Sequence, residues 1–403
     1  MKLGIIREGK MPPDKRVPLT PEQCVQIQET YPNVEVYVQK SGVRKIEDEA
    51  YARLGLPVVD DISNCDILMG VKEVNIEDLI PNKTYLFFSH TFKKQPYNRD
   101  LLNAILSKKI RLIDYEVLTK PNGMRLIGFG RYAGIVGTYN GFLAFGKKHG
   151  LYDLKPAHQC EDRVELEEEL KRIQLPSNTK ITLTGYGRVG HGAREILATM
   201  GLKEVDSSEF LTRIFNEPVY TQLEVDEYFE REDGKPFDKS AFYESGAGHR
   251  STFRQYLDVT DLYIACHYWD ASSPYIFTRA DLQNGSHQVS VVADISCDID
   301  GPVASTLRPS TIDSPLYGYN PITEQEDNYS QSGVICVMAV DNLPCELPKD
   351  ASEDFGNELL KNIIPHLLGE DKDNIIARAS ETNLNGELTE YFTYLEPYRK
   401  GEE

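Results

Sequence analysis

Three glycines, Gly185, Gly187 and Gly190, form the pattern G-x-G-x-x-G near the middle of the chain. In this spacing the first glycine permits a tight turn, the second lets the backbone approach a pyrophosphate, and the third lets a helix pack closely on a strand. Apolar residues alternate before the glycines and recur at helical spacing after them, which predicts a strand, a turn and a helix over residues 180–197. The N–H groups at the start of such a helix bind phosphate. The predicted coenzyme contacts in this turn are Gly185, Gly187, Arg188, Val189 and Gly190.

An acidic residue follows at the distance that a dinucleotide-binding unit requires. Asp206 comes after a short predicted strand at residues 203–205 and lies 19 residues beyond Gly187. A carboxylate there accepts hydrogen bonds from the ribose diol of adenosine and repels a 2′-phosphate, so we expect NAD as the coenzyme. Arg213 leaves NADP open as the alternative, if the turn at residues 207–208 folds its guanidinium back. A glycine-rich turn that holds no ligand is the remaining interpretation.

Four basic residues in the first third of the chain could act on a substrate. Lys72 and His90 each follow an apolar predicted strand, and ligands of α/β proteins collect at the carboxyl ends of parallel strands. Histidine has an unperturbed pKa of about 6.5, which suits general acid/base catalysis near neutral pH. Arg16 and Arg125 carry guanidinium groups, which bind carboxylates in a bidentate manner. Each of the four could instead be a capping or surface residue.

The elements that must position these residues alternate between strand and helix, which predicts an α/β protein with parallel sheets. Later apolar runs are typical of strands buried on both faces of a sheet. The segment 221–251 is polar and is predicted to wrap the surface as helix and loop, and a helix over 351–368 is predicted to be capped by Asp350. The predicted strands are 2–6, 34–38, 67–71, 84–88, 111–113, 262–266, 289–293 and 334–340, and the early helices are 21–30, 46–54 and 98–107.

A glycine-bearing helix is predicted over residues 132–150, where Gly134, Gly137 and Gly141 share one face. Each glycine inside a helix costs about 1 kcal/mol relative to alanine. Three on one face therefore indicate very close packing against another backbone. We interpret this helix as the one that crosses into a second domain; a loop with incidental glycines is the alternative.

Composition and charge limit the classes of function. The chain has 403 residues, 40% of them hydrophobic and 27% charged, which is ordinary for a globular protein with two cores. Its net charge of −19 argues against a nucleic-acid partner, which would need a basic face. The sequence contains no apolar run of about 18 residues, so we expect no membrane span. The amino terminus runs directly into a predicted strand without a secretory leader, so a cytoplasmic location is expected.

The cysteines do not indicate a redox or metal framework. Seven cysteines are scattered along the chain without a C-x-x-C pair, so neither disulfides nor a metal site is predicted. Cys266 and Cys336 lie within apolar predicted strands and are interpreted as small core residues.

Several segments together resemble one family. The combination is similar to the lysine-forming saccharopine dehydrogenases, above all to the lysine–2-oxoglutarate reductase domain of the bifunctional aminoadipic semialdehyde synthases, within a wider group that includes alanine dehydrogenase. The resemblance covers nearly the whole chain. Its segments are residues 14–21 (DKRVPLTP), 70–73 (GVKE), 87–91 (FFSHT), 112–116 (LIDYE), 129–134 (FGRYAG), 293–298 (ADISCD) and 339–344 (AVDNLP).

The resemblance implies two Rossmann-like domains with parallel sheets and a cleft between them. Residues 1–133 plus 341–403 would form a discontinuous substrate domain, and residues 134–340 would bind the dinucleotide. The implied reaction is the reversible condensation of lysine with 2-oxoglutarate to an imine, which takes hydride from a reduced nicotinamide to give saccharopine. The bifunctional relatives are associated with NADPH and carry a second dehydrogenase, for which 403 residues leave no room.

The resemblance also assigns roles to individual residues. Lys72 and His90 match the catalytic lysine and histidine of the family, and Glu73 and Glu116 match acidic neighbours that tune the lysine. Asp298 matches an acid near the nicotinamide. The remaining implied site residues are Arg16 and Arg125, for substrate carboxylates, and Asp294, for the coenzyme.

Two other functions stay open at this point. One is an amino-acid dehydrogenase that uses ammonia, such as alanine dehydrogenase. The other is a dinucleotide-binding regulator without catalytic activity, against which the presence of Lys72 and His90 argues.

Overall fold

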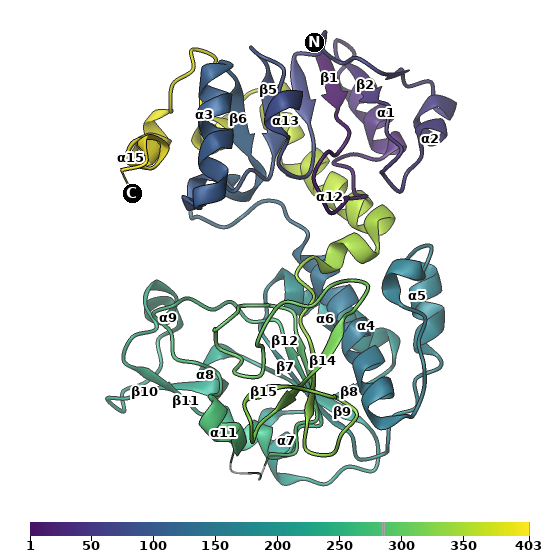
Figure 1. Ribbon diagram of the computed structural model, residues 1–403, viewed down its shortest axis with the longest axis vertical. Helices are drawn as coiled ribbons and strands as arrows, with labels where there is room; N and C mark the ends of the chain where they lie inside the picture. Colours follow the sequence, from purple (N-terminus) through teal and green to yellow (C-terminus); the bar gives the residue numbers. More distant parts are fainter. Residues whose placement is uncertain (284, 286, 403) are drawn as a thin grey trace. The chain divides into compact units, whose positions relative to one another are not determined.

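The computed structural model describes residues 1–283, 285 and 287–402, which form two compact units. Unit 1 comprises Met1–Phe129 and Pro348–Glu403, and unit 2 comprises Gly130–Leu347 (Figure 1). Unit 1 is therefore discontinuous in sequence. The assignment of a substrate domain to 1–133 plus 341–403 and of a coenzyme domain to 134–340 stays a prediction.

Unit 1 contains a six-stranded sheet in the order β3-β2-β1-β4-β5-β6, and every pair in it is parallel. The chain steps outward from β1 to one edge, returns, and then steps from β4 to the other edge. This is the doubly wound order, whose ligands bind at the carboxyl ends of the strands where the direction reverses. The strands are β1 (Lys2–Ile5), β2 (Glu35–Gln39), β3 (Val58–Val59), β4 (Ile67–Met69), β5 (Thr84–Phe87) and β6 (Arg111–Asp114).

Helices cover both faces of this sheet, and each face has its own apolar core. One face packs against α1 (Pro21–Thr30), α12 (Pro348–Asn362), α13 (Ile364–Leu368) and α14 (Ile375–Ala379), so the carboxyl-terminal segment completes the unit. The other face packs against α3 (Arg99–Ser107), which also contacts α15 (Glu396–Lys400). The helix α2 (Asp48–Arg53) lies between β2 and β3 in the chain.

The helix at the start of the second segment of unit 1 differs from its prediction. A single helix over 351–368 with Asp350 as its cap is wrong, because α12 begins at Pro348 and Asp350 lies in its first turn. The helix ends at Asn362 and α13 restarts at Ile364. Pro365 explains the break, since proline has no N–H to donate to the preceding turn.

Unit 2 contains an eight-stranded sheet in the order β15-β14-β16-β13-β12-β7-β9-β8. The run from β16 to β8 is parallel, whereas β14 and β15 are antiparallel additions at one edge. The predicted parallel sheet is thus confirmed, with an antiparallel pair of strands added at one edge. The strands are β7 (Lys180–Thr184), β8 (Lys203–Glu204), β9 (Val219–Leu223), β12 (Leu262–Ala265), β13 (Val291–Asp294), β14 (Leu316–Asn320), β15 (Gln325–Asp327) and β16 (Ile335–Met338).

Two long helices, α4 (Gly130–His149) and α6 (Arg188–Thr199), pack backbone to backbone on one face of this sheet (Figure 1). A Cβ on Gly134 would lie 1.9 Å from the carbonyl oxygen of Val189, so only glycine fits there. Gly137 and Gly141 instead face the side chains of Ile295 and Ala293. The prediction of close backbone packing is thus confirmed for Gly134, and the other two glycines make room for the sheet.

The segment 221–251 differs most from expectation. It begins inside β9, whose residues are all buried, and it contains the hairpin β10 (Phe229–Arg231) and β11 (His249–Ser251). The polar residues Thr221 and Gln222 are buried in this strand, and Gln222 Nε2 donates to the carbonyl of Gly185 at 2.7 Å. The remaining helices of unit 2 are α5 (Arg163–Leu170), α7 (Ser207–Thr212), α8 (Val225–Tyr228), α9 (Lys239–Glu244), α10 (Arg254–Leu257) and α11 (Arg279–Gln283).

All seven cysteines are free thiols, and Cys266 and Cys336 are buried, which confirms their assignment to the core. Across the described ranges, no helix is long and apolar enough to cross a bilayer. In the same residues, no group of three or more histidine, cysteine or acidic side chains is arranged to hold a metal ion.

Candidate active site

The carboxyl edge of the unit 1 sheet gathers ionisable side chains from neighbouring strands. Parallel strands end at a common edge, so residues that follow them in separate parts of the sequence become neighbours. The residues brought together in this way are Glu8 after β1, Lys72 and Glu73 after β4, His90 after β5, and Glu116 after β6.

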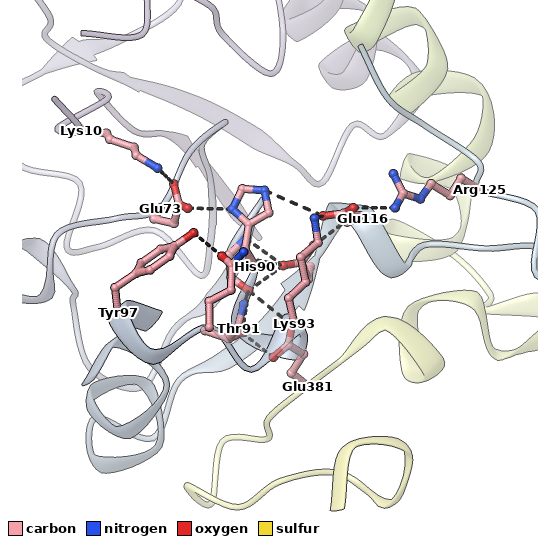
Figure 2. A network of polar contacts seen from close by, with 12 residues as sticks. Lys10, Glu73, His90, Thr91, Lys93, Tyr97, Glu116, Arg125 and Glu381 are labelled. Atoms are coloured by element: carbon pink, nitrogen blue, oxygen red, sulfur yellow. Dashed lines mark hydrogen bonds and ion pairs between the residues drawn. The ribbon is translucent and has the colours of Figure 1, made fainter. Parts of the chain in front are cut away.

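His90 is hydrogen-bonded to Glu73 through one ring nitrogen, with Nδ1 2.7 Å from Oε1 (Figure 2). The other oxygen of Glu73 accepts a hydrogen bond from Lys10 Nζ at 2.6 Å. Burial acts to raise the pKa of Glu73, but the hydrogen bonds from His90 and Lys10 lower it to about 2. Because an ionised carboxylate can only accept, we assign the proton of the neutral imidazole to Nδ1, which leaves Nε2 as a proton acceptor.

The second ring nitrogen faces another carboxylate. His90 Nε2 lies 3.8 Å from Glu116 Oε2, and Lys93 Nζ lies 2.9 Å from the same oxygen. Arg125 pairs with the other oxygen of Glu116 (Figure 2). Burial opposes ionisation of Glu116, but Lys93 and Arg125 lower the pKa of its carboxyl. The imidazole therefore lies between two ionised acids.

The backbone of His90 is held in the left-handed region, at φ 57° and ψ 10°. This conformation is uncommon for residues other than glycine and costs free energy unless the surroundings enforce it. Asp114 enforces it, because its Oδ2 accepts hydrogen bonds from the backbone N–H of Ser89 at 2.7 Å and of His90 at 3.2 Å. The buried carboxylate of Asp114, at the end of β6, thus fixes the backbone from which the imidazole projects.

Lys72 is the second proton-transfer candidate. Burial lowers the pKa of its ammonium, and the nearby charge of Arg16 lowers it further. Its backbone N–H donates to Glu8 Oε2 at 2.9 Å. Lys72, Glu73 and Glu8 line a small cavity of about 50 Å³. A lysine with a lowered pKa gives up its proton more readily, which suits it to proton transfer.

Glu8 is a site residue that the sequence analysis missed. Its oxygens accept hydrogen bonds from the backbone N–H groups of Val71 and Lys72, at 2.7 and 2.9 Å. Burial raises the pKa of its carboxyl to about 7. The signal was available, because Glu8 follows the first apolar strand as Lys72 and His90 follow theirs.

The two predicted substrate arginines lie in different surroundings. Arg16 is only 3% exposed, binds both carboxylate oxygens of Asp14 at 3.0 and 2.6 Å, and stacks 4.2 Å from the centre of the Phe129 ring. Its guanidinium therefore orders its own loop. Arg125 is exposed beside Glu116. Binding of substrate carboxylates by either arginine stays a prediction.

In unit 2, the glycine turn has the shape of a dinucleotide cradle. Gly185 has φ +93°, and a Cβ on it would lie 2.4 Å from the carbonyl oxygen of Cys266. A Cβ on Gly190 would lie 2.1 Å from the carbonyl oxygen of Gly185. By contrast, a Cβ on Gly187 would meet none of the described atoms within 4 Å, and α6 begins directly after it, at Arg188. These residues fit a pyrophosphate at Gly187 and the start of α6.

Coenzyme contact by Asp206 stays a prediction. The strand before it, β8, lies at the sheet edge, and β9 takes the place beside β7. The Asp206 carboxylate caps α7, accepting hydrogen bonds from Ser208 N and Oγ. Glu224, which follows β9, stands at the end of the strand beside β7. Sequence reasoning missed it because β9 was not recognised as a strand.

Asp294, the last residue of β13, and Asp298 in the following loop differ in burial and in hydrogen bonding. Asp294 is fully buried, and its oxygens accept hydrogen bonds from Ser296 Oγ at 2.5 Å and Thr306 Oγ1 at 2.7 Å, so it orders the loop. Asp298 is half-buried, and burial together with the charge of Asp294 raises its pKa to about 6. Coenzyme contact by Asp294, Arg188 and Val189, and a nicotinamide role for Asp298, stay predictions.

Comparison with known sequences gives one family match and several relatives. Residues 4–136 match the family described as alanine dehydrogenase/PNT, N-terminal domain. An alpha-aminoadipic semialdehyde synthase of Arabidopsis thaliana is 28% identical over 99% of this chain and 41% of the plant protein. The mitochondrial alpha-aminoadipic semialdehyde synthase of Mus musculus is 27% identical over 100% of this chain and 48% of the mouse protein. The chain thus spans less than half the length of these two relatives.

A third relative matches end to end more evenly. The saccharopine dehydrogenase (NAD⁺, L-lysine-forming) of Emericella nidulans is 25% identical over 89% of this chain and 90% of the fungal protein.

Solved structures share the fold. An L-alanine dehydrogenase superposes with a TM-score of 0.66 at 16% identity, covering 99% of this chain and 100% of that one. A transhydrogenase from Sinorhizobium meliloti gives 0.59 at 14% identity, covering 96% and 99%. At identities this low, the superpositions bear on the fold alone. They confirm the α/β class with two mainly parallel sheets.

Proposed function

Because the chain is homologous along nearly its whole length to lysine-forming saccharopine dehydrogenases and to part of the alpha-aminoadipic semialdehyde synthases, we propose that it interconverts lysine plus 2-oxoglutarate and saccharopine with NAD(H). The coarser conclusion, an oxidoreductase related to NAD(P)-dependent dehydrogenases, rests on the same homology. NADP(H) is the alternative coenzyme.

One observation carries the proposal: His90 is held between ionised Glu73 and Glu116, and Lys72, whose pKa is lowered, shares a cavity with Glu73. Condensation of an amine with a ketone needs a base to deprotonate the ammonium and an acid to protonate the departing hydroxyl. An imidazole with an open Nε2 and a partly buried amine can fill these two roles.

The carboxylates determine how His90 would work. Glu73 keeps the Nδ1 proton in place, so Nε2 is the atom that accepts a proton from the substrate amine. Once protonated, the ring stays oriented by Glu73 and its charge is balanced by Glu116. The same ring can then return the proton to the leaving oxygen. Lys72, with its lowered pKa, is the group we assign to the second proton at the carbonyl.

Exposed cations surround this centre and could hold the substrate carboxylates. Lys10, Lys93 and Arg125 are 39%, 38% and 58% exposed, and each is paired with Glu73 or Glu116. The net charge of −19 offers no long-range attraction for an anionic substrate, so binding must come from such local cations.

The coenzyme would be held by the turn of unit 2. Gly185, Gly187 and Gly190 with the start of α6 fit its pyrophosphate, and Glu224 is placed for the adenosine ribose. A bound reduced nicotinamide supplies hydride to the imine carbon.

The proposal is tested by following nicotinamide absorbance with two substrate pairs. We expect oxidation of the reduced coenzyme with lysine plus 2-oxoglutarate and none with pyruvate plus ammonia. Turnover with only the second pair would establish an ammonia-dependent amino-acid dehydrogenase instead. No turnover with either pair, in a protein that binds NADH, would favour a non-catalytic regulator.

A further inference from the structure

Four buried side chains form a continuous hydrogen-bonded chain next to the backbone of His90. Ser89 Oγ lies 2.5 Å from Asp114 Oδ2 and 2.7 Å from Thr91 Oγ1, and Thr91 Oγ1 lies 2.6 Å from Glu381 Oε2. All four residues are 0% exposed. Figure 2 shows Thr91 and Glu381 below His90 in that view. The mechanism proposed above does not use Glu381.

Glu381 is brought to this place by the carboxyl-terminal segment of unit 1. Its backbone N–H donates to the carbonyl of Leu112 in β6 at 2.8 Å, and Ser380 forms an antiparallel bridge with Ile113. The segment therefore extends the edge of the sheet beyond β6. The Glu381 side chain is fixed by this pairing.

The number of protons shared by these four hydrogen-bonded side chains can be counted. The three short oxygen–oxygen contacts need one hydrogen each, because two oxygens at 2.5 to 2.7 Å repel without a hydrogen between them. The hydroxyls of Ser89 and Thr91 supply two. The third must come from a carboxylic acid, so either Asp114 or Glu381 is protonated.

The other donors decide which acid holds the proton. Asp114 accepts backbone N–H groups from Ser89 and His90 on Oδ2 and from Glu116 on Oδ1, which favours its ionised form. The hydrogen-bond partners of the Glu381 carboxyl are the two hydroxyls, including a longer contact of 3.3 Å with Ser89. Burial raises the pKa of both acids, and the charge of Asp114 raises that of Glu381 further. The proton therefore belongs to Glu381.

We propose that Glu381 is a positioning residue that acts as a neutral acid. It donates its proton to Thr91, which donates to Ser89, which donates to Asp114. This order keeps Asp114 ionised and so keeps the backbone of His90 in its left-handed conformation. The inference rests on the proposed function only in taking His90 as the acid/base.

The neighbouring titratable groups leave this assignment in place. The groups facing Glu381 and Asp114 are Tyr394 on η8 (Glu390–Leu395), Tyr398 on α15, Tyr115 directly after β6, and His90 itself. Burial raises the pKa of Tyr394 to about 12, so its phenol stays neutral. When Glu381 loses its proton at high pH, one short contact loses its hydrogen and two buried charges repel. Activity should then fall on the alkaline side.

Paired substitutions test this role. Glu381→Gln keeps a neutral donor toward Thr91, so we expect kcat at neutral pH within about twofold of wild type and no alkaline fall due to this group. Glu381→Leu and Thr91→Val break the chain, and each should lower kcat about tenfold or more while leaving the KM for coenzyme unchanged. Glu346→Gln is the matched control. Glu346 is another buried acid with a raised pKa, hydrogen-bonded to Asn140 in unit 2, and its variant should keep the wild-type pH profile.

A second readout does not depend on activity. Carbon NMR of protein labelled at its glutamate carboxyls, with Glu381→Gln for assignment, should show Glu381 as a neutral acid at neutral pH. An ionised Glu381 there, or a Glu381→Gln variant with the wild-type alkaline fall, would overturn the inference. An inactive wild-type protein would reject the dehydrogenase proposal, while the NMR measurement would still decide the protonation of Glu381.

Discussion

The two units have a similar order of parallel strands. They differ in which strand lies beside the first one, and in the residues that follow the carboxyl ends of the strands. In unit 1 the strand after β1 in the sequence, β2, also lies beside it in the sheet. In unit 2 the strand after β7 in the sequence, β8, lies at the sheet edge, and β9 takes the place beside β7. Adjacency in a sheet is set by long-range pairing, so sequence order alone does not tell which residue faces a ligand.

The carboxyl ends themselves carry opposite chemistry. After β7 come glycines, whose lack of side chains lets the backbone approach a phosphate. After the matching strand of unit 1 comes Glu8, and its neighbours supply Lys72 and His90. The same plan therefore offers backbone N–H groups in one unit and titrating side chains in the other. We expect coenzyme affinity and proton transfer to be separable by mutation.

The largest effect should come from the proton-transfer groups of unit 1. His90→Gln and Lys72→Met should each lower kcat by about 10²- to 10⁴-fold, the range for loss of a general acid or base. Coenzyme affinity, measured by fluorescence titration of NADH, should stay nearly unchanged. A His90 variant that loses coenzyme affinity as severely as turnover would contradict the division between the units.

A smaller effect is expected at the ribose end of unit 2. Glu224→Ala should weaken NADH binding about 10- to 100-fold, as for loss of a hydrogen bond to a charged group, whereas Asp206→Ala should change it little. Asp226→Ala is the control, because Lys239 pairs with both Glu224 and Asp226 and loses a partner in either variant. Titration of the three variants with NADH and NADPH shows how much each acid contributes to coenzyme affinity. Stronger weakening by Asp206→Ala would support the role predicted for Asp206.

Local patterns predicted the local parts of this site. Lys72 and His90 were found because each follows an apolar strand, and α1 was predicted over residues 21–30, which the structure confirms. The glycine spacing located the turn before α6. These features depend on residues close together in sequence.

Contacts between distant segments were not predictable from such patterns. Glu381 contacts Thr91 across 290 residues, and no local periodicity records that pairing. The strand β9 was missed because the buried Thr221 and Gln222 have the polarity of surface residues, and their burial results from the pairing of β9 with β7, a distant segment of the sequence. Glu224, which follows β9, was therefore missed as a candidate residue.

Glycine packing in unit 2 gives the next prediction. Gly192→Ala would place a Cβ 1.9 Å from the carbonyl oxygen of Arg131, so α4 and α6 must separate. Overpacking of this kind costs about 1 to 3 kcal/mol, or several degrees in Tm. Gly187→Ala is the matched control, because its Cβ meets open space: Tm should hold while NADH binding weakens. A stable Gly192→Ala variant would show that the two helices do not depend on this contact.

The smallest effect concerns two acids of one cavity whose pKa values move in opposite directions. Hydrogen bonds from His90 and Lys10 outweigh burial and lower the pKa of Glu73 from 4.5 to about 2, so its contribution to stability is present above pH 4.5 and is lost as the pH falls toward 2. Burial raises the pKa of Glu8 from 4.5 to about 7, so the folded state binds its proton more tightly and stability falls as the pH rises from 4.5 to 7. Glu73→Gln should flatten the acid side of a urea-midpoint profile, and Glu8→Gln the side approaching neutrality. Equal changes on both sides in either variant would mean that Glu8 and Glu73 do not titrate separately.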